Sequence, residues 1–171
     1  MRRNALISAA TVLLFASASA VGADSVASFK LSSGHKVTII EAPFAESGLK
    51  YSESAPCLVN GHIPFGTDCS IPTTYVKHIS VVIQGQAFQL ESSHMFNAWG
   101  MRHLTTYKGK PVTYFIGACP SKEHCIFRGL FSDGAGSFVA EWLIFQGATT
   151  RTVLSNDNEI INLFMKSMGT K

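Results

Sequence analysis

The chain has 171 residues, of which 46% are hydrophobic and 15% are charged, and its formal net charge at pH 7 is +3. Arg2 and Arg3 lie in an N-terminal segment that we expect to be removed, so the remaining chain carries a formal charge of +1. That charge excludes strong attraction to nucleic acid or to anionic membranes, and no later stretch approaches the roughly 20 apolar residues of a membrane-spanning helix.

The N-terminus has the pattern of a secretory signal peptide. Two arginines precede the mostly apolar run 5–15, and small residues follow up to Ala23. This order predicts cleavage after Ala23, which leaves one periplasmic or secreted domain at residues 24–171. No cysteine ends the signal region, so we expect no lipid anchor.

Four cysteines lie in the exported part, where an oxidising compartment would pair them. Four cysteines allow three connectivities. Sequence proximity favours Cys57 with Cys69 and Cys119 with Cys125, because turn-forming residues separate each pair. Such short loops stabilise the fold by about 3 kcal/mol or less each, so their main effect would be to hold loop shape.

Alternating apolar residues predict strands along most of the first half. Residues 27–31 and 36–41 flank a short turn and indicate a hairpin, and 75–84 and 86–90 indicate a second hairpin that turns at Gly85. Between them, residues 42–74 form a long connection rich in Pro, Gly and Ser, and loops of this length in a compact domain usually have a function or are disordered.

The stretch 91–100 changes period and predicts a short helix. Ser92 or Ser93 can cap it, Met95, Phe96 and Trp99 can share one face, and glycine follows at position 100.

The second half predicts more strands and ends in a helix. Strands are expected at 103–107, 112–117, 125–131, 137–145 and 151–154, and a Gln-Gly turn near residue 147 repeats the one at Gly85. In the tail, Asn156 or Ser155 can cap a helix whose apolar stripe is Ile160, Ile161, Phe164 and Met168. The predicted fold class is α+β: a predominantly antiparallel β-sheet with a short mid-chain helix and a C-terminal helix packed on it.

The loop around Asp133, read as Ser132-Asp133-Gly134-Ala135-Gly136-Ser137, invites three interpretations. A phosphate cradle needs a following helix and a calcium loop needs more oxygen ligands, and neither condition is met. A hairpin turn, in which Asp-Gly supplies positive backbone angles, is the remaining interpretation. Asp133 at its tip would then face solvent or a partner.

The histidines give only weak support to a metal site or a catalytic site. Cys119, His124 and Cys125 offer three zinc ligands, but a structural site needs a fourth, and export favours the disulfide. We therefore expect no metal and no cofactor. A small hydrolase or lyase would use His94 or His103 with Glu91 or Asp133, although nothing in their spacing selects one pair.

The loop from Cys57 to Cys69 is the better functional candidate, because it is unusually apolar for a turn-rich segment. It either folds back over the core or forms a preorganised recognition loop, with Phe65 as anchor and His62 and Asp68 as polar contacts. In build, the chain resembles exported inhibitor and immunity proteins that act against cell-wall or secreted hydrolases. We expect an exported binding protein with a protein partner; the alternatives are the hydrolase and a structural subunit of an envelope assembly.

Overall fold

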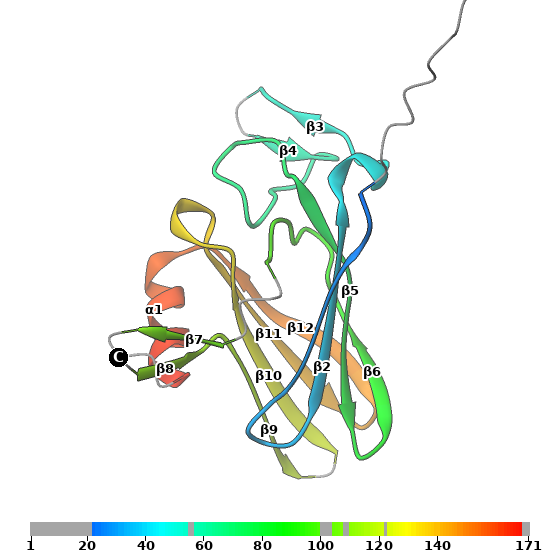
Figure 1. Ribbon diagram of the computed structural model, residues 1–171, viewed down its shortest axis with the longest axis vertical. Coiled ribbons are helices and arrows are strands. Elements are labelled where there is room, and N and C mark those ends of the chain that lie inside the picture. Colours follow the sequence, from blue (N-terminus) through cyan, green and yellow to red (C-terminus); the bar gives the residue numbers. More distant parts are fainter. Residues whose placement is uncertain (1–21, 55–56, 100–103, 108–109, 122, 169–171) are drawn as a thin grey trace, which may run out of the picture.

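Two four-stranded antiparallel sheets face each other in the computed structural model, which describes residues 22–54, 57–99, 104–107, 110–121 and 123–168 (Figure 1). The predicted signal peptide, up to residue 21, lies outside these residues. The first sheet has the order β1 (Ser25–Lys30), β2 (Lys36–Pro43), β5 (Thr74–Ile83) and β6 (Gln86–Leu90). The second has the order β12 (Ala148–Ser155), β11 (Phe138–Phe145), β10 (His124–Phe131) and β9 (Phe115–Ser121).

Each sheet is a meander whose last two strands are joined by a Gln-Gly turn. Gln84 and Gly85 have φ values of 51° and 85°, and Gln146 and Gly147 have 50° and 83°. Two consecutive positive values are the signature of the two-residue hairpin turn whose twist matches that of the strands. Both predicted Gln-Gly hairpins are therefore confirmed, as is the hairpin of β1 and β2.

The core lies between the sheets and is rich in aromatic side chains. Phe127, Phe138 and Trp142 are each 0% exposed. The Phe115 ring stacks on Trp142 with centroids 5.9 Å apart, and it meets the Phe131 ring edge-on at 6.1 Å. Alternate residues of β10 and β11 point into this layer, as their period-two pattern predicted.

Helix α1 (Asn158–Ser167) covers part of the outer face of the second sheet. Its predicted apolar stripe buries Ile161, Phe164 and Met168 against Val139 of β11. Val139 lies on the face of β11 that packs against the helix, and it is 0% exposed because the helix covers it. The cap is Asp157 rather than Asn156 or Ser155: its side chain accepts from the backbone N–H groups of the first turn at 2.8 and 3.1 Å.

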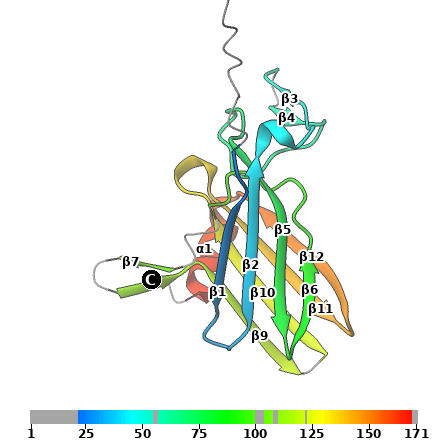
Figure 2. The same cartoon turned by 45° about the vertical axis from the view of Figure 1, so that its right-hand side comes forward.

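Several smaller elements of the described chain lie outside the two sheets. The strand pair β3 (Tyr51–Ser52) and β4 (Leu58–Val59) lies at one end of the sandwich, after the 3₁₀ turn η1 (Phe44–Glu46). The hairpin of β7 (Leu104–Tyr107) and β8 (Lys110–Thr113) projects away from the sheets (Figure 2).

The predicted mid-chain helix is wrong. Residues 91–99 form turns and isolated bridges, in which Met95 pairs with Phe65 and Phe96 pairs with Tyr75; position 100 lies outside the described residues. His94, Asn97 and Trp99 have positive φ, which no α-helix contains. Backbone pairing with two neighbouring segments satisfies the groups that a helix would have satisfied internally, so tertiary contacts override the local period.

Candidate functional site

Three segments meet at one end of the sandwich, which we call the loop end: residues 57–73, 91–99 and 132–137 (Figure 1). The first contains the Cys57–Cys69 disulfide, and Cys119–Cys125 closes a separate turn between β9 and β10. Both predicted pairings are confirmed. The two disulfides agree with an oxidising, extracellular environment.

The disulfide loop is attached to the segment 91–99 by backbone hydrogen bonds. Phe65 N–H donates to His94 O at 2.9 Å, and Phe96 N–H donates to Phe65 O at 2.8 Å. Gly66 has φ +99°, and a Cβ there would lie 1.7 Å from Phe96 O. No residue with a side chain fits this approach without displacing the backbone, so Gly66 permits the contact.

Asn97 ties the same segment to the start of β5. Its Oδ1 accepts from Thr73 N–H at 2.9 Å, Thr73 Oγ1 at 2.9 Å and Thr74 N–H at 3.1 Å. Its Nδ2 donates to Gly66 O at 2.9 Å. One half-buried side chain thus joins three segments of the chain.

The loop between β10 and β11 reaches the same place. Ser132 N–H donates to Ala98 O at 3.2 Å, and a Cβ on Gly136 would lie 3.2 Å from Gly66 O. The hairpin is confirmed by the register of β10 with β11. The positive angles belong to Ser132 and Gly134, however, while Asp133 is extended with φ −146°.

The four predicted contact residues divide into exposed and supporting positions. His62, Asp68 and Asp133 are exposed, whereas Phe65 is half-buried and its ring lies 6.3 Å from that of Phe138. The loop therefore folds back over the core at Phe65 and remains accessible on both sides of it.

Sequence reasoning noted the apolar character of the disulfide loop but did not identify which large apolar side chains the loop end exposes. Ile63 is 61% exposed, Ile71 is 55% exposed and Trp99 is 39% exposed. In the sequence, each of these side chains is recognisable as a large apolar residue within a segment rich in turn-forming residues. For Trp99, the expected helix concealed that signal.

A second feature is the seam between the edge strands β6 and β12, where side chains of the second sheet bridge the gap. Three alternate backbone carbonyls accept these bonds: Gln89 O from Thr149 Oγ1 at 2.9 Å, Glu91 O from Trp142 Nε1 at 2.8 Å, and Ser93 O from Arg151 Nη1 at 2.7 Å. The seam thereby satisfies an edge that would otherwise offer free acceptors to another chain.

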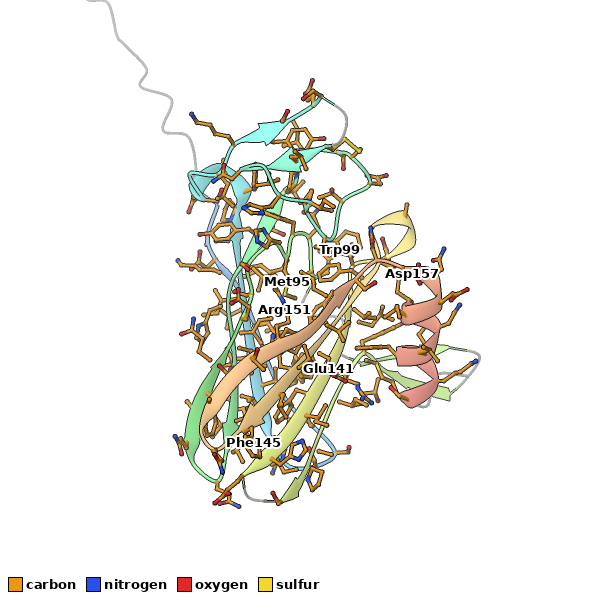
Figure 3. The ribbon with its side chains drawn as sticks, turned by 180° about the vertical axis from the view of Figure 1, so that it is seen from behind. Met95, Trp99, Glu141, Phe145, Arg151 and Asp157 are labelled. Atoms are coloured by element: carbon orange, nitrogen blue, oxygen red, sulfur yellow. A yellow bond between two sulfur atoms is a disulfide. The ribbon has the colours of Figure 1, made fainter. Side chains whose placement is uncertain are left out.

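A polar cavity of about 620 Å³ opens along this seam, and we call it the seam groove. Its lining comes from two segments, Gln89–His94 and Thr149–Arg151. Figure 3 shows Arg151 at mid-height on the sandwich and Trp99 nearer the loop end. The imidazole of His62 lies against that of His94, with ring centroids 4.6 Å apart, so the groove borders the disulfide loop.

Three side chains that line the groove have shifted pKa values: Glu91, His94 and Arg151. Hydrogen bonds from the Ser93 hydroxyl and backbone N–H hold the pKa of Glu91 below its usual range. Burial, then the charges of His62 and Arg151, lower the pKa of His94, so its imidazole is neutral at pH 7. Burial also lowers the pKa of Arg151, whose guanidinium nonetheless stays protonated.

The groove brings together two of the predicted catalytic residues, Glu91 and His94, while His103 lies outside the described residues. Glu91 is engaged with Ser93 rather than with an imidazole. The zinc interpretation loses its ligands, because the sulfurs of Cys119 and Cys125 are bonded to each other. No group of three potential metal ligands occurs within the described ranges.

Comparison of the chain with protein-family models, with curated proteins and with solved structures gives no match. No helix in the described part of the chain is both long and apolar enough to cross a membrane.

Proposed function

We propose that the chain is an exported protein that binds and inhibits a secreted or cell-wall-acting hydrolase through its loop end. One observation carries the proposal: three segments remote in sequence are fixed together there and expose large apolar side chains, Ile63, Ile71 and Trp99. Binding hot spots are commonly large apolar or aromatic side chains held in a rigid setting.

The rigidity of the loop end favours recognition. A disulfide, the backbone bonds of Phe65 and the four bonds of Asn97 already order these segments before any partner arrives. Preordering lowers the entropy cost of association, which otherwise subtracts from affinity. His62, Asp68 and Asp133 supply exposed polar groups around the apolar ones.

Capture of partners from a periplasmic extract tests the proposal. We expect Ile63→Ser and Trp99→Ala each to reduce recovery of the partner about tenfold or more, as loss of a hot spot does. Leu163→Ser is the matched control, since Leu163 is 58% exposed on α1, outside the loop end. The recovered partner should lose hydrolytic activity when the wild-type chain is added. Equal recovery by all three variants would contradict the proposal.

A second candidate, a small hydrolase or lyase, is favoured by the presence of His94 and Glu91 in one groove. A neutral imidazole at pH 7 is suited to act as a general base. A screen on cell-wall and ester substrates decides this candidate, and a turnover rate unchanged by His94→Ala and Glu91→Ala would eliminate it. The structural-subunit alternative has no supporting contact and stays a prediction.

A further inference from the structure

We propose that the seam groove binds a carboxylate of an acidic peptide segment, held by Arg151 with His94 and His62 alongside. This inference does not rest on the proposed function, because the groove lining includes none of the exposed apolar side chains Ile63, Ile71 and Trp99, although His62 borders both surfaces.

The guanidinium of Arg151 is held in place by Ser93, but only some of its N–H donors are engaged. It donates to Ser93 O at 2.7 Å and to Ser93 Oγ at 3.4 Å, which leaves further N–H donors among its five. In the described part of the chain, the ion pairs are Lys77 with Asp24 and Arg128 with Glu141. Arg151 is therefore a partly buried cation without a carboxylate in contact, and a fork of two parallel donors is the geometry that carboxylates prefer.

Glu91 leaves the guanidinium of Arg151 without a carboxylate in contact, although its charge offsets that of the cation at longer range. Its carboxylate turns to Ser93, accepting from the backbone N–H at 3.1 Å, and acts on Arg151 only through longer-range attraction. Glu91 and Arg151 together bring the local charge close to zero. A ligand with a single negative charge fits this balance better than a phosphate dianion, which Glu91 would repel more strongly.

The lining favours a polar, extended ligand. Ser92, Ser93, Thr149 and Thr150 are among the lining residues of the groove, and none of the lining residues is Phe, Tyr or Trp. The groove runs along Gln89–His94, the end of β6 and the turns that follow it, and faces β12 on its other side, which suits a short extended peptide more than a compact molecule.

The imidazole of His94 couples the site to pH. His94 faces Arg151, Glu91 and His62, and the net effect of these neighbours and of burial is to keep it neutral. A bound carboxylate adds an opposite charge beside it and favours protonation. Peptide binding is therefore coupled to uptake of a proton by His94, and the affinity increases as pH falls from 7.5 to 5. A site that depended on an ionised carboxylate of its own would instead lose affinity as pH falls.

The test uses calorimetric titration of the disulfide-bonded chain with a blocked peptide of alternating Gly and Glu. A Gly-Gln peptide of the same length and inorganic phosphate serve as comparisons. We expect the Glu peptide to bind at least about tenfold more tightly than either, as expected for a charge-assisted pair. Equal binding of the Gln peptide would overturn the proposal, and so would preferential binding of phosphate.

Five variants separate recognition from mere folding and from the proposed function. Arg151→Gln should weaken binding about tenfold or more, and Lys77→Gln, which removes an equal charge elsewhere, should not. Glu91→Gln should tighten binding severalfold because it removes a repelling charge. His94→Gln should flatten the pH dependence. Tightening by Glu91→Gln cannot result from damage to the fold, so its absence in a folded variant would refute the site even if Arg151→Gln proved unstable. Ile63→Ser should leave peptide binding unchanged, so failure here and failure of the proposed function are distinguishable.

Discussion

Replacement of Asn97 by alanine should loosen the loop end more than any other polar truncation there. The change removes four hydrogen bonds of 2.9 to 3.1 Å to Thr73, Thr74 and Gly66. Each is worth about 0.5–1.5 kcal/mol net, and because the site is half-buried, water replaces part of them, which leaves about 2 kcal/mol. Alanine at φ 43° adds about 1 kcal/mol, since the left-handed region is unfavourable for it.

The expected loss is therefore about 3 kcal/mol, or roughly 6–12 °C in Tm for a chain of this size. Urea unfolding followed by tryptophan fluorescence, with the disulfides intact, measures it. Asn97→Gly is the matched control: it loses the same bonds without the conformational cost and should lose about 2 kcal/mol. Hydrogen exchange provides a local readout, because the Thr73 and Thr74 amides lose their acceptor. A loss below about 1 kcal/mol, or unchanged protection of both amides, would refute the reasoning.

Three further predictions concern the loop end, the helix and the groove. Gly66→Ala should destabilise the chain by more than about 2 kcal/mol, because the new Cβ would meet Phe96 O at 1.7 Å; a Tm within 2 °C of wild type would contradict the close approach. Asp157→Ala should cost about 1 kcal/mol in urea unfolding and Asp157→Asn much less, since asparagine also caps; equal losses would count against the cap. The pKa of His94 is lower in the folded chain than in the unfolded chain, so the unfolded chain takes up this proton first as pH falls. The contribution of His94 to the free energy of unfolding is therefore fully present above about pH 6.5 and declines as pH falls toward the folded-state pKa. His94→Gln should reduce the fall in unfolding free energy between pH 7.5 and 5, and identical pH profiles would show that the imidazole is not shifted.

The sequence alone determined the features that depend on neighbours along the chain. Period-two alternation identified the strands of both sheets, and the Gln-Gly pairs marked two hairpins because few residues tolerate two consecutive positive φ values. Short separation selected both disulfides. The apolar stripe of the last helix followed from its 3.6-residue period, although three adjacent polar residues left its cap ambiguous and Asp157 fills it.

Only the tertiary structure decided what lies across the sandwich. A helical period in residues 91–99 yielded to backbone pairing with Phe65 and Val76, because those partners satisfy buried polar groups while also burying Met95 and Phe96. The same pairing placed His62 against His94, which are 32 positions apart in the sequence. Arg151 reached Ser93 only because the edges of two separate sheets meet at the seam. Local patterns specify which residues alternate or turn, whereas the choice of partner strands rests on contacts between distant segments, and both candidate surfaces are made of such contacts.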